Sequence, residues 1–371
     1  MGAVTRAAFT SVRSLVVKVG SALLQEGPAA FQRIADDIAA LHAQGVRTTI
    51  VSSGAVALGR PKLGLRKGGL TLEQKQAAAA AGQTLLVDAW ARAFEPHKLQ
   101  TAQALITLDV TEIRRRWLNA RSTLNTLLDL GAVPVVNEND TVATEEIRYG
   151  DNDRLAARVA QLVGADLLVL LSDIDGLYTV DPRNDPGARK LSEVPEITDE
   201  ILAMAGDGNA EAGVGTGGMV TKLAAAGIAA QSGCATAITH GAHDKPIQSL
   251  ADAGHGSWFS APEGMRIGRT SWLAGAIDPK GSIQVDDGAG KAVRDGKSLL
   301  PVGVTAVSGQ FERGDPVMIV SAQGQVIARG ISAYDANDAR LIGGQKTDRI
   351  EEILGYKRAA ALVHADDILL S

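Results

Sequence analysis

Leu15-Val16-Val17-Lys18-Val19-Gly20-Ser21 is the stretch of sequence that decides the fold. Four of its first five residues are apolar, which is typical of a strand buried on both faces of a parallel sheet. The strand ends in a glycine turn and carries a single lysine. A buried ammonium group is costly unless it has a function or reaches solvent. Lys18 therefore predicts a site that needs positive charge.

A second glycine turn with one lysine lies about two hundred residues later, in Gly215-Thr216-Gly217-Gly218-Met219-Val220-Thr221-Lys222. The pattern predicts the start of a helix, where backbone N–H groups and the helix dipole attract anions. Lys222 adds a mobile positive charge. Two cationic turns that converge suit phosphoryl transfer, whose transition state spreads negative charge over several oxygens. The turn is not a Walker motif, because no Gly-Lys-Ser/Thr follows at the required spacing.

Predicted strands and helices alternate from residue 15 to about residue 240. Apolar runs predict strands at 15–19, 46–51, 133–136 and 167–171, and helical spacing marks 31–41, 124–128 and 155–163. This alternation predicts an α/β fold with a mostly parallel sheet sandwiched by helices. Ligands bind beyond the carboxyl ends of such strands. The residues expected to face one crevice there are Gly20, Ser53, Asn137, Asp140 and Asp173.

The sequence pattern changes after about residue 260. Short alternating runs at 282–285, 317–320 and 326–329 are separated by turn signals, which predicts a small, mostly β, barrel-like domain. The boundary is expected near Ala261-Pro262-Glu263-Gly264. We therefore predict two domains, residues 1–261 and 272–371.

Composition excludes several classes of protein. The net charge of -5 over 371 residues argues against a dedicated nucleic-acid or membrane-surface protein. The single cysteine allows no intrachain disulfide, no apolar run could span a bilayer and no secretory signal is visible, so we expect a cytoplasmic protein. His240 and His243 share a segment, but no cysteine or third histidine joins them in the sequence, so no metal site is predicted.

Several motifs together resemble the glutamate 5-kinase family in its bacterial two-domain form, an amino-acid-kinase domain followed by a PUA domain. The motifs are Val16–Ser21, Ser52-Ser53-Gly54-Ala55, Asn137-Glu138-Asn139-Asp140, Gly150-Asp151-Asn152-Asp153, Gly215–Lys222 and, in the tail, Ile353-Leu354-Gly355-Tyr356. The resemblance implies the amino-acid-kinase fold and ATP-dependent phosphorylation of the side-chain carboxylate of L-glutamate. The product would be γ-glutamyl phosphate, in the first step of proline biosynthesis.

The resemblance also implies roles for individual residues. It assigns catalysis to Lys18, Lys222 and Asp153, where Asp153 orients the two lysines rather than only capping a helix. It assigns glutamate binding to Ser53, Asp140 and Asn152: Asp140 suits the substrate ammonium, and the other two suit the α-carboxylate. The residues assigned to the nucleotide are Lys18, Ser172, Asp173, Thr216, Gly217, Gly218, Met219, Val220, Thr221 and Lys222.

The cofactors implied are ATP and Mg²⁺, with the cation held mainly by nucleotide phosphates and water rather than by the protein. The partners implied are L-glutamate, L-proline as a feedback inhibitor, further copies of the chain in a homo-oligomer, and γ-glutamyl phosphate reductase as the acceptor of the product. The chain departs from the family at Asp175, where related kinases often carry a lysine. The contacts of Asp175 are therefore left open.

Two alternatives remain at this point. A sister kinase for acetylglutamate, uridylate, carbamate or aspartate shares the glycine-rich helix start, but Asn137–Asp140 and the PUA-like tail disfavour it. An RNA-binding protein is the alternative from another class, because PUA domains often bind RNA. Residues 272–371 hold 11 Lys and Arg against 13 Asp and Glu, and so lack the basic surface that phosphate backbones require.

Overall fold

The computed structural model describes residues 6–24, 26–66, 68–107, 114–142, 151–205, 218–252, 255–261, 279–357 and 359–370. Contacts between Cα atoms divide the chain into two compact units, residues 1–112 with 119–265 and residues 113–118 with 266–371. Each unit has its own sheet and its own hydrophobic core. The predicted domain ends at 261 and 272 border or fall within residues 262–278, outside the described residues, and stay a prediction.

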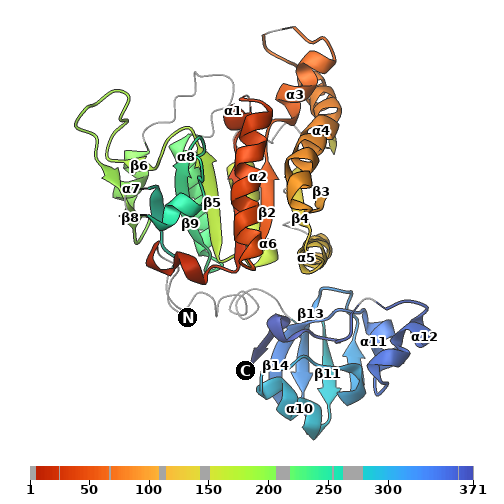
Figure 1. The fold of residues 1–371 in the computed structure, drawn as a ribbon. Helices are drawn as coiled ribbons and strands as arrows, with labels where there is room; N and C mark the ends of the chain where they lie inside the picture. Colours follow the sequence, from red (N-terminus) through yellow and green to blue (C-terminus); the bar gives the residue numbers. More distant parts are fainter. Residues whose placement is uncertain are drawn as a thin grey trace. The chain divides into compact units, whose positions relative to one another are not determined.

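The first unit is built on an eight-stranded sheet (Figure 1). In spatial order its strands are β3 (Thr101–Ile106), β4 (Val133–Glu138), β2 (Arg47–Ser52), β1 (Ser14–Val19), β5 (Leu167–Ser172), β9 (Ala235–His240), β10 (Ser257–Phe259) and β8 (Glu193–Val194). Neighbouring strands pair in parallel, except that β10 runs antiparallel to β9. The predicted mostly parallel sheet is confirmed. A separate two-stranded ribbon joins β6 (Leu177–Tyr178) to β7 (Lys190–Leu191).

Helices cover both faces of this sheet. Among the described residues, the helices of the unit are α1 (Ser21–Leu24), α2 (Pro28–Ala43), α3 (Ala55–Lys62), α4 (Leu72–Phe94), α6 (Asp151–Val163), α7 (Asp199–Met204) and α8 (Met219–Ala230), with short 3-10 turns η1 (Arg6–Ser11), η2 (Glu95–His97), η4 (Asp140–Val142) and η5 (Gln248–Ala251). The first residues of α5 (Arg114–Asp129) are assigned to the second unit, and the rest of this helix, from Asn119, is assigned to the first. Helices α2 and α4 pack together and against β2 and β3, whereas α6 and α8 pack together and against β1, β5 and β9.

The alternation of side chains along β1 decides where its lysine lies. Leu15, Val17 and Val19 belong to the core that also contains Phe31 and other α2 residues. Successive side chains of a strand point to opposite faces. Lys18 therefore points to the face that α6 and α8 cover, close to the carboxyl end of the strand.

Helices α3 and α4 cross at two glycines. A Cβ atom on Gly59 would collide with the carbonyl oxygen of Ala78, and one on Gly82 would collide with that of Ala55. The two backbones can touch only because neither glycine has a side chain. Helix α3 starts directly after Gly54, whose φ of 110° lies in the left-handed region that favours glycine. The crossing therefore fixes α4 relative to the turn at the end of β2.

The second unit holds a five-stranded sheet with short helices around it. In spatial order its strands are β12 (Val304–Gly309), β11 (Gly281–Val285), β13 (Pro316–Val320), β14 (Val326–Ile331) and β15 (Ile368–Leu370). Its helices are α10 (Asp287–Arg294), α11 (Ala336–Ile342) and α12 (Ile350–Leu354), with 3-10 turns η7 (Pro301–Gly303), η8 (Thr347–Arg349) and η9 (Ala365–Asp367). The strands expected at 282–285, 317–320 and 326–329 are confirmed as β11, β13 and β14.

Candidate active site

A buried ion cluster joins three of the predicted residues. The Nζ atom of Lys18 lies 2.8 Å from Oδ1 of Asp153, and Nζ of Lys222 lies 3.6 Å from Oδ2 of the same carboxylate. Their exposed fractions are 8%, 1% and 5% for Lys18, Asp153 and Lys222. Two ammonium groups against one carboxylate leave the cluster with a net positive charge. It can therefore attract a further anion.

The electrostatics of the cluster keep its carboxylate ionised. Burial by itself would raise the pKa of Asp153, but the charges of Lys18 and Lys222 and a hydrogen bond from Thr221 together lower it. The pKa of Lys222 is lowered from its ordinary value of 10.5, because burial and the charge of Lys18 outweigh the attraction of Asp153. Both buried ammonium groups pair with this one carboxylate, which offsets part of the cost of burying them and leaves one positive charge uncompensated.

Gly218, the last residue of the predicted glycine turn, lies at the start of α8. Gly218 caps the helix in an extended conformation without a side-chain cap, and Met219 and Val220 form its first turn. The Thr221 hydroxyl lies 2.7 Å from Oδ2 of Asp153 and 2.9 Å from the Gly218 carbonyl oxygen. The first N–H groups of a helix have no intrahelical partner and suit an anion. Thr216 and Gly217, also predicted for the nucleotide, lie outside the described residues.

Ser172 ends β5, the strand next to β1, and Asp173 follows it. Ser172 donates a hydrogen bond to Oδ1 of Asp173 at 3.1 Å, and Asp173 lies close enough to act electrostatically on Lys222. Asp175, whose contacts the sequence left open, accepts from the Tyr178 hydroxyl at 2.8 Å and pairs with Lys190 at 2.8 Å. Burial and this carboxylate raise the pKa of Tyr178 to about 12. The Asp175 carboxylate therefore links the loop after β5 to both strands of the β6–β7 ribbon.

A chain of side-chain hydrogen bonds runs from α4 to the end of β2. Asn137 donates from Nδ2 to Oε1 of Gln83 at 2.8 Å. Asn152 donates from Nδ2 to Oδ1 of Asn137 at 3.2 Å and to Oγ of Ser53 at 2.6 Å. Two predicted substrate residues, Ser53 and Asn152, thus come into direct contact. Asn152 precedes Asp153 in the first turn of α6, so this chain, which we call the amide chain (Gln83, Asn137, Asn152 and Ser53), adjoins the ion cluster.

Asp140 lies in η4, two residues beyond the end of β4. Burial raises the pKa of its carboxyl group above the ordinary 3.8. No described residue forms an ion pair or hydrogen bond with this carboxylate, whereas Thr141 in the same turn bonds to Asn139 at 2.6 Å. A partly buried carboxylate without a counter-charge is suited to receive a cationic group of a ligand.

Three histidines meet beside the end of β9. The ring of His243 packs edge-on against His240 and His255, with ring centroids 5.6 and 5.4 Å apart. His240 and His243 share one segment of the sequence, and the fold adds a third imidazole, that of His255 in the loop before β10. Within the described ranges, no group of three His, Cys, Asp or Glu side chains has the geometry to hold a metal ion. Burial and the two neighbouring rings lower the pKa of His243.

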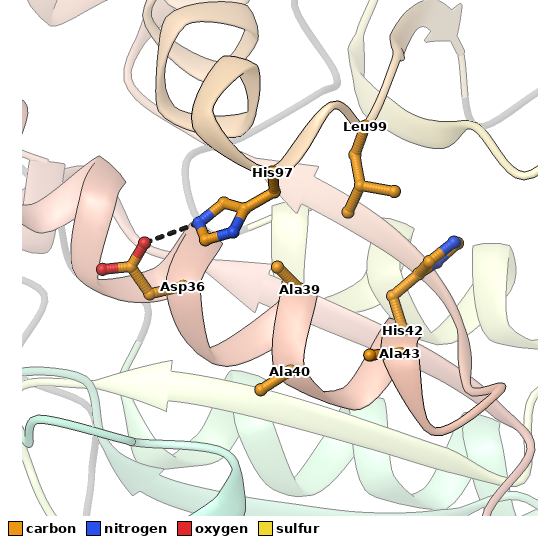
Figure 2. A pocket seen from close by; sticks show the side chains of 7 residues that line it. All are labelled: Asp36, Ala39, Ala40, His42, Ala43, His97 and Leu99. Carbon is orange, nitrogen blue, oxygen red and sulfur yellow. Dashed lines mark hydrogen bonds and ion pairs between the residues drawn. The ribbon is translucent and has the colours of Figure 1, made fainter.

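A cavity of about 370 Å³ lies elsewhere in the first unit, and Figure 2 shows its lining. Its walls are three alanines and His42 of α2 together with Leu99, and His97 pairs with Asp36 across 2.7 Å at its edge. Ala43 precedes β2 and Leu99 precedes β3, so the cavity lies at the amino ends of these strands. The ion cluster and the amide chain lie at the opposite, carboxyl ends.

Comparison with known proteins gives the family. Residues 13–240 match the amino acid kinase family and residues 281–354 match the PUA domain. The glutamate 5-kinase of Caulobacter vibrioides is 53% identical over 373 residues, with 99% of each chain covered. This chain belongs to the glutamate 5-kinase family. A second member of that family, from Paramagnetospirillum magneticum, is 53% identical over 98% of this chain and 99% of its own length.

Solved structures of other kinases match more distantly. Carbamate kinase from Giardia lamblia bound to AMP-PNP has a TM-score of 0.47 and 16% identity, and covers 67% of this chain and 99% of its own. Isopentenyl phosphate kinase from T. acidophilum has a TM-score of 0.46, with 16% identity over 66% of this chain and 99% of its own. The resemblance to glutamate 5-kinases and the predicted fold class are confirmed by the family matches and by the sheet itself. None of the described helices is both long and apolar enough to cross a membrane.

Proposed function

We propose that this chain transfers the γ-phosphoryl group of ATP to the side-chain carboxylate of L-glutamate, forming γ-glutamyl phosphate for proline biosynthesis. The observation that carries the proposal is the buried cluster of Lys18, Asp153 and Lys222, with its net positive charge. Membership of the glutamate 5-kinase family supports the choice of substrate. The single cysteine, Cys234, is buried, and a chain with one cysteine can form no intrachain disulfide, which fits a cytoplasmic, reducing compartment.

The proposed reaction needs no general base. The side chain of glutamate has an ordinary pKa of about 4.3 and is ionised near neutral pH. Catalysis then consists of holding two anions in line and neutralising the charge that develops between them. Lys18 and Lys222 stabilise the oxygens of the transferred group, and Asp153 holds both ammonium groups in position.

The residues present fit a nucleotide with its metal ion. Two ammonium groups and the N-terminus of α8 form a cationic surface for phosphates, with Ser172 and Asp173 at the next strand end. Mg²⁺ would be held chiefly by phosphate oxygens and water, since the described residues provide no cluster of metal ligands. When bound, the ion adds charge neutralisation at the phosphates.

The amide chain and Asp140 provide the groups that glutamate requires. Asp140 can pair with the substrate ammonium, which would supply its missing counter-charge. Asn152 and Ser53 can contact the α-carboxylate as neutral hydrogen-bonding groups. Asp140 and Ser53 both follow the carboxyl ends of strands, β4 and β2, and Asn152 is the sequence neighbour of Asp153 in the ion cluster. The side-chain carboxylate of the substrate can then extend toward Lys18.

Asp140→Ala is expected to raise the KM for glutamate roughly 10- to 150-fold, the effect of losing one charge-assisted hydrogen bond. The KM for ATP should stay nearly unchanged. Because burial raises the pKa of Asp140, the wild-type enzyme should lose glutamate affinity as pH falls toward that pKa, and the variant should lose this dependence. Steady-state kinetics across pH measures both effects. A collapse of ATP affinity instead would place Asp140 on the nucleotide side.

Free L-proline is expected to inhibit the enzyme competitively with glutamate, because proline carries the same ammonium and α-carboxylate. Initial rates over a grid of both amino acids measure the effect, and inhibition that saturating glutamate cannot relieve would contradict a shared site.

We further propose a homo-oligomer, testable by sedimentation, and direct transfer of the product to γ-glutamyl phosphate reductase. An acyl phosphate is a reactive mixed anhydride, which favours such transfer.

Trapping the product tests the function directly. Incubation with ATP, Mg²⁺, hydroxylamine and L-glutamate should give the γ-hydroxamate, together with glutamate-dependent consumption of ATP. A panel containing acetylglutamate, aspartate, carbamate and UMP serves as the control. Turnover of one of these acceptors in preference to glutamate would overturn the assignment of the substrate.

A further inference from the structure

Gln83 is a buried polar residue that the sequence analysis did not assign. It lies on α4 beside Gly82, at the point where α3 and α4 touch, and only 8% of its surface is exposed. Its Oε1 accepts from Asn137, and among the described residues its buried Nε2 has no hydrogen-bond partner. A buried amide that leaves one group unpaired is costly, so this glutamine is a poor choice for packing alone.

The amide chain has a direction, which follows from its donors and acceptors. Because Oε1 of Gln83 can only accept, Asn137 must turn its NH₂ group toward Gln83 and its Oδ1 toward Asn152. Asn152 then donates both hydrogens of Nδ2, one to Asn137 and one to Ser53. Its Oδ1 is left as an acceptor, and the Ser53 hydroxyl, which accepts from Asn152, keeps its own proton to donate elsewhere.

The opposite direction is also chemically complete. If the first amide donated to Asn137, each amide along the chain would turn over, and Oδ1 of Asn152 would accept the proton of Ser53. Ser53 would then offer only lone pairs to a substrate, and a carboxylate cannot bind to lone pairs. A glutamine can present either its oxygen or its NH₂ group, so the direction of the chain depends on which of these atoms faces Asn137. In this structure that atom is Oε1 of Gln83, which leaves Ser53 as a donor.

We propose that Gln83 is a positioning residue that sets the direction of the amide chain, so that Ser53 donates to the amino-acid substrate. The proposal rests on the glutamate site proposed above. The glycine contact between α3 and α4 holds Gln83 in register with Ser53, because α3 begins just beyond that serine. Gln83 acts through Asn137 and Asn152, without a role in the transfer of the phosphoryl group.

Two variants of nearly the same size test the proposal. Gln83→Met removes the acceptor, and Gln83→Glu keeps an acceptor that, when ionised, can only accept. We expect Gln83→Met to raise the KM for glutamate ~10-fold, with the KM for ATP unchanged and kcat within ~3-fold of wild type. Gln83→Glu should keep a glutamate KM close to wild type at pH 8, although its buried charge should lower the melting temperature more than methionine does.

The variant that raises the glutamate KM more shows whether Gln83 has a positioning role or only a packing role. A merely structural role predicts that glutamate KM follows the melting temperature, with Gln83→Glu the worse variant in both, and that result would overturn the proposal. Gln44→Met, the same change at an exposed residue after α2, is the matched control. If either variant fails to yield folded protein, the other still decides: an unchanged KM in Gln83→Met or a tenfold increase in Gln83→Glu contradicts the proposed direction.

A double-mutant cycle with Asn152→Ala completes the test. If Gln83 acts through Asn152, adding Gln83→Met to Asn152→Ala should raise the glutamate KM no further. Full additivity would show that Gln83 acts by another route. Ser53→Ala, measured alongside, distinguishes a failure of the proposed glutamate site from a failure of the role proposed for Gln83. An unchanged glutamate KM in Ser53→Ala would refute the proposed substrate site itself, whereas a raised KM there with no effect of Gln83→Met would refute only the role of Gln83.

Discussion

Lys18→Ala and Lys222→Ala are each expected to lower kcat about 100-fold or more while changing the glutamate KM little. Both ammonium groups lie on Asp153 in the resting site, where they can stabilise charge that develops only as the phosphoryl group is transferred. Loss of one such preorganised contact typically costs a factor of this size in kcat. Steady-state kinetics with both substrates varied measures the effect.

The control for this prediction is Lys291→Ala, which removes an exposed lysine from α10 in the second unit and should leave kcat unchanged. The lowered pKa of Lys222 adds a test without mutation. An amine with a lowered pKa loses its proton at lower pH, so kcat should fall with rising pH before the ordinary lysine value of 10.5 is reached. A loss of tenfold or less in both alanine variants would contradict the assignment of these lysines.

Asp153→Ala is expected to impair both folding and catalysis. It would leave two buried ammonium groups without their shared carboxylate, and removal of one partner of a buried ion pair costs about 3–5 kcal/mol. For a unit of this size the melting temperature should fall on the order of 10 °C. The kcat of the folded fraction should also drop, because Lys18 and Lys222 lose the group that orients them. Thermal unfolding and active-site-normalised kinetics measure the two effects separately.

Asp129→Ala provides the matched comparison, since it breaks an ion pair with Arg47 in which 68% of the aspartate side chain is exposed. Surface pairs contribute about 0–1 kcal/mol, so its melting temperature should barely change. A stable Asp153→Ala variant with normal turnover would show that this aspartate only caps α6, the alternative that the sequence left open.

The sequence by itself determined the architecture and the cationic centre. Apolar runs a strand long, separated by amphipathic helices, can bury their surface only as a covered parallel sheet, so β1, β2, β4 and β5 were predictable. A lysine inside such a run and another at a glycine-rich helix start also stand out locally. Lys18 and Lys222 could therefore be named from these patterns, and Asp153 from the family resemblance, before any distance was known. Only the fold places both lysines against the same carboxylate.

The tertiary structure alone decided which other side chains complete the site. Gln83 stands in an alanine-rich helix where its neighbours signal only packing, and its role follows from the contact of Gly59 with Gly82 and from its bond to Asn137. His255 joins His240 and His243, and Lys190 pairs with Asp175, across loops whose course no local pattern encodes. Such pairings depend on which elements become neighbours in space. Periodicity and motif spacing predict the helix or strand in which a residue lies. A hydrogen bond between two elements depends instead on how the whole unit packs.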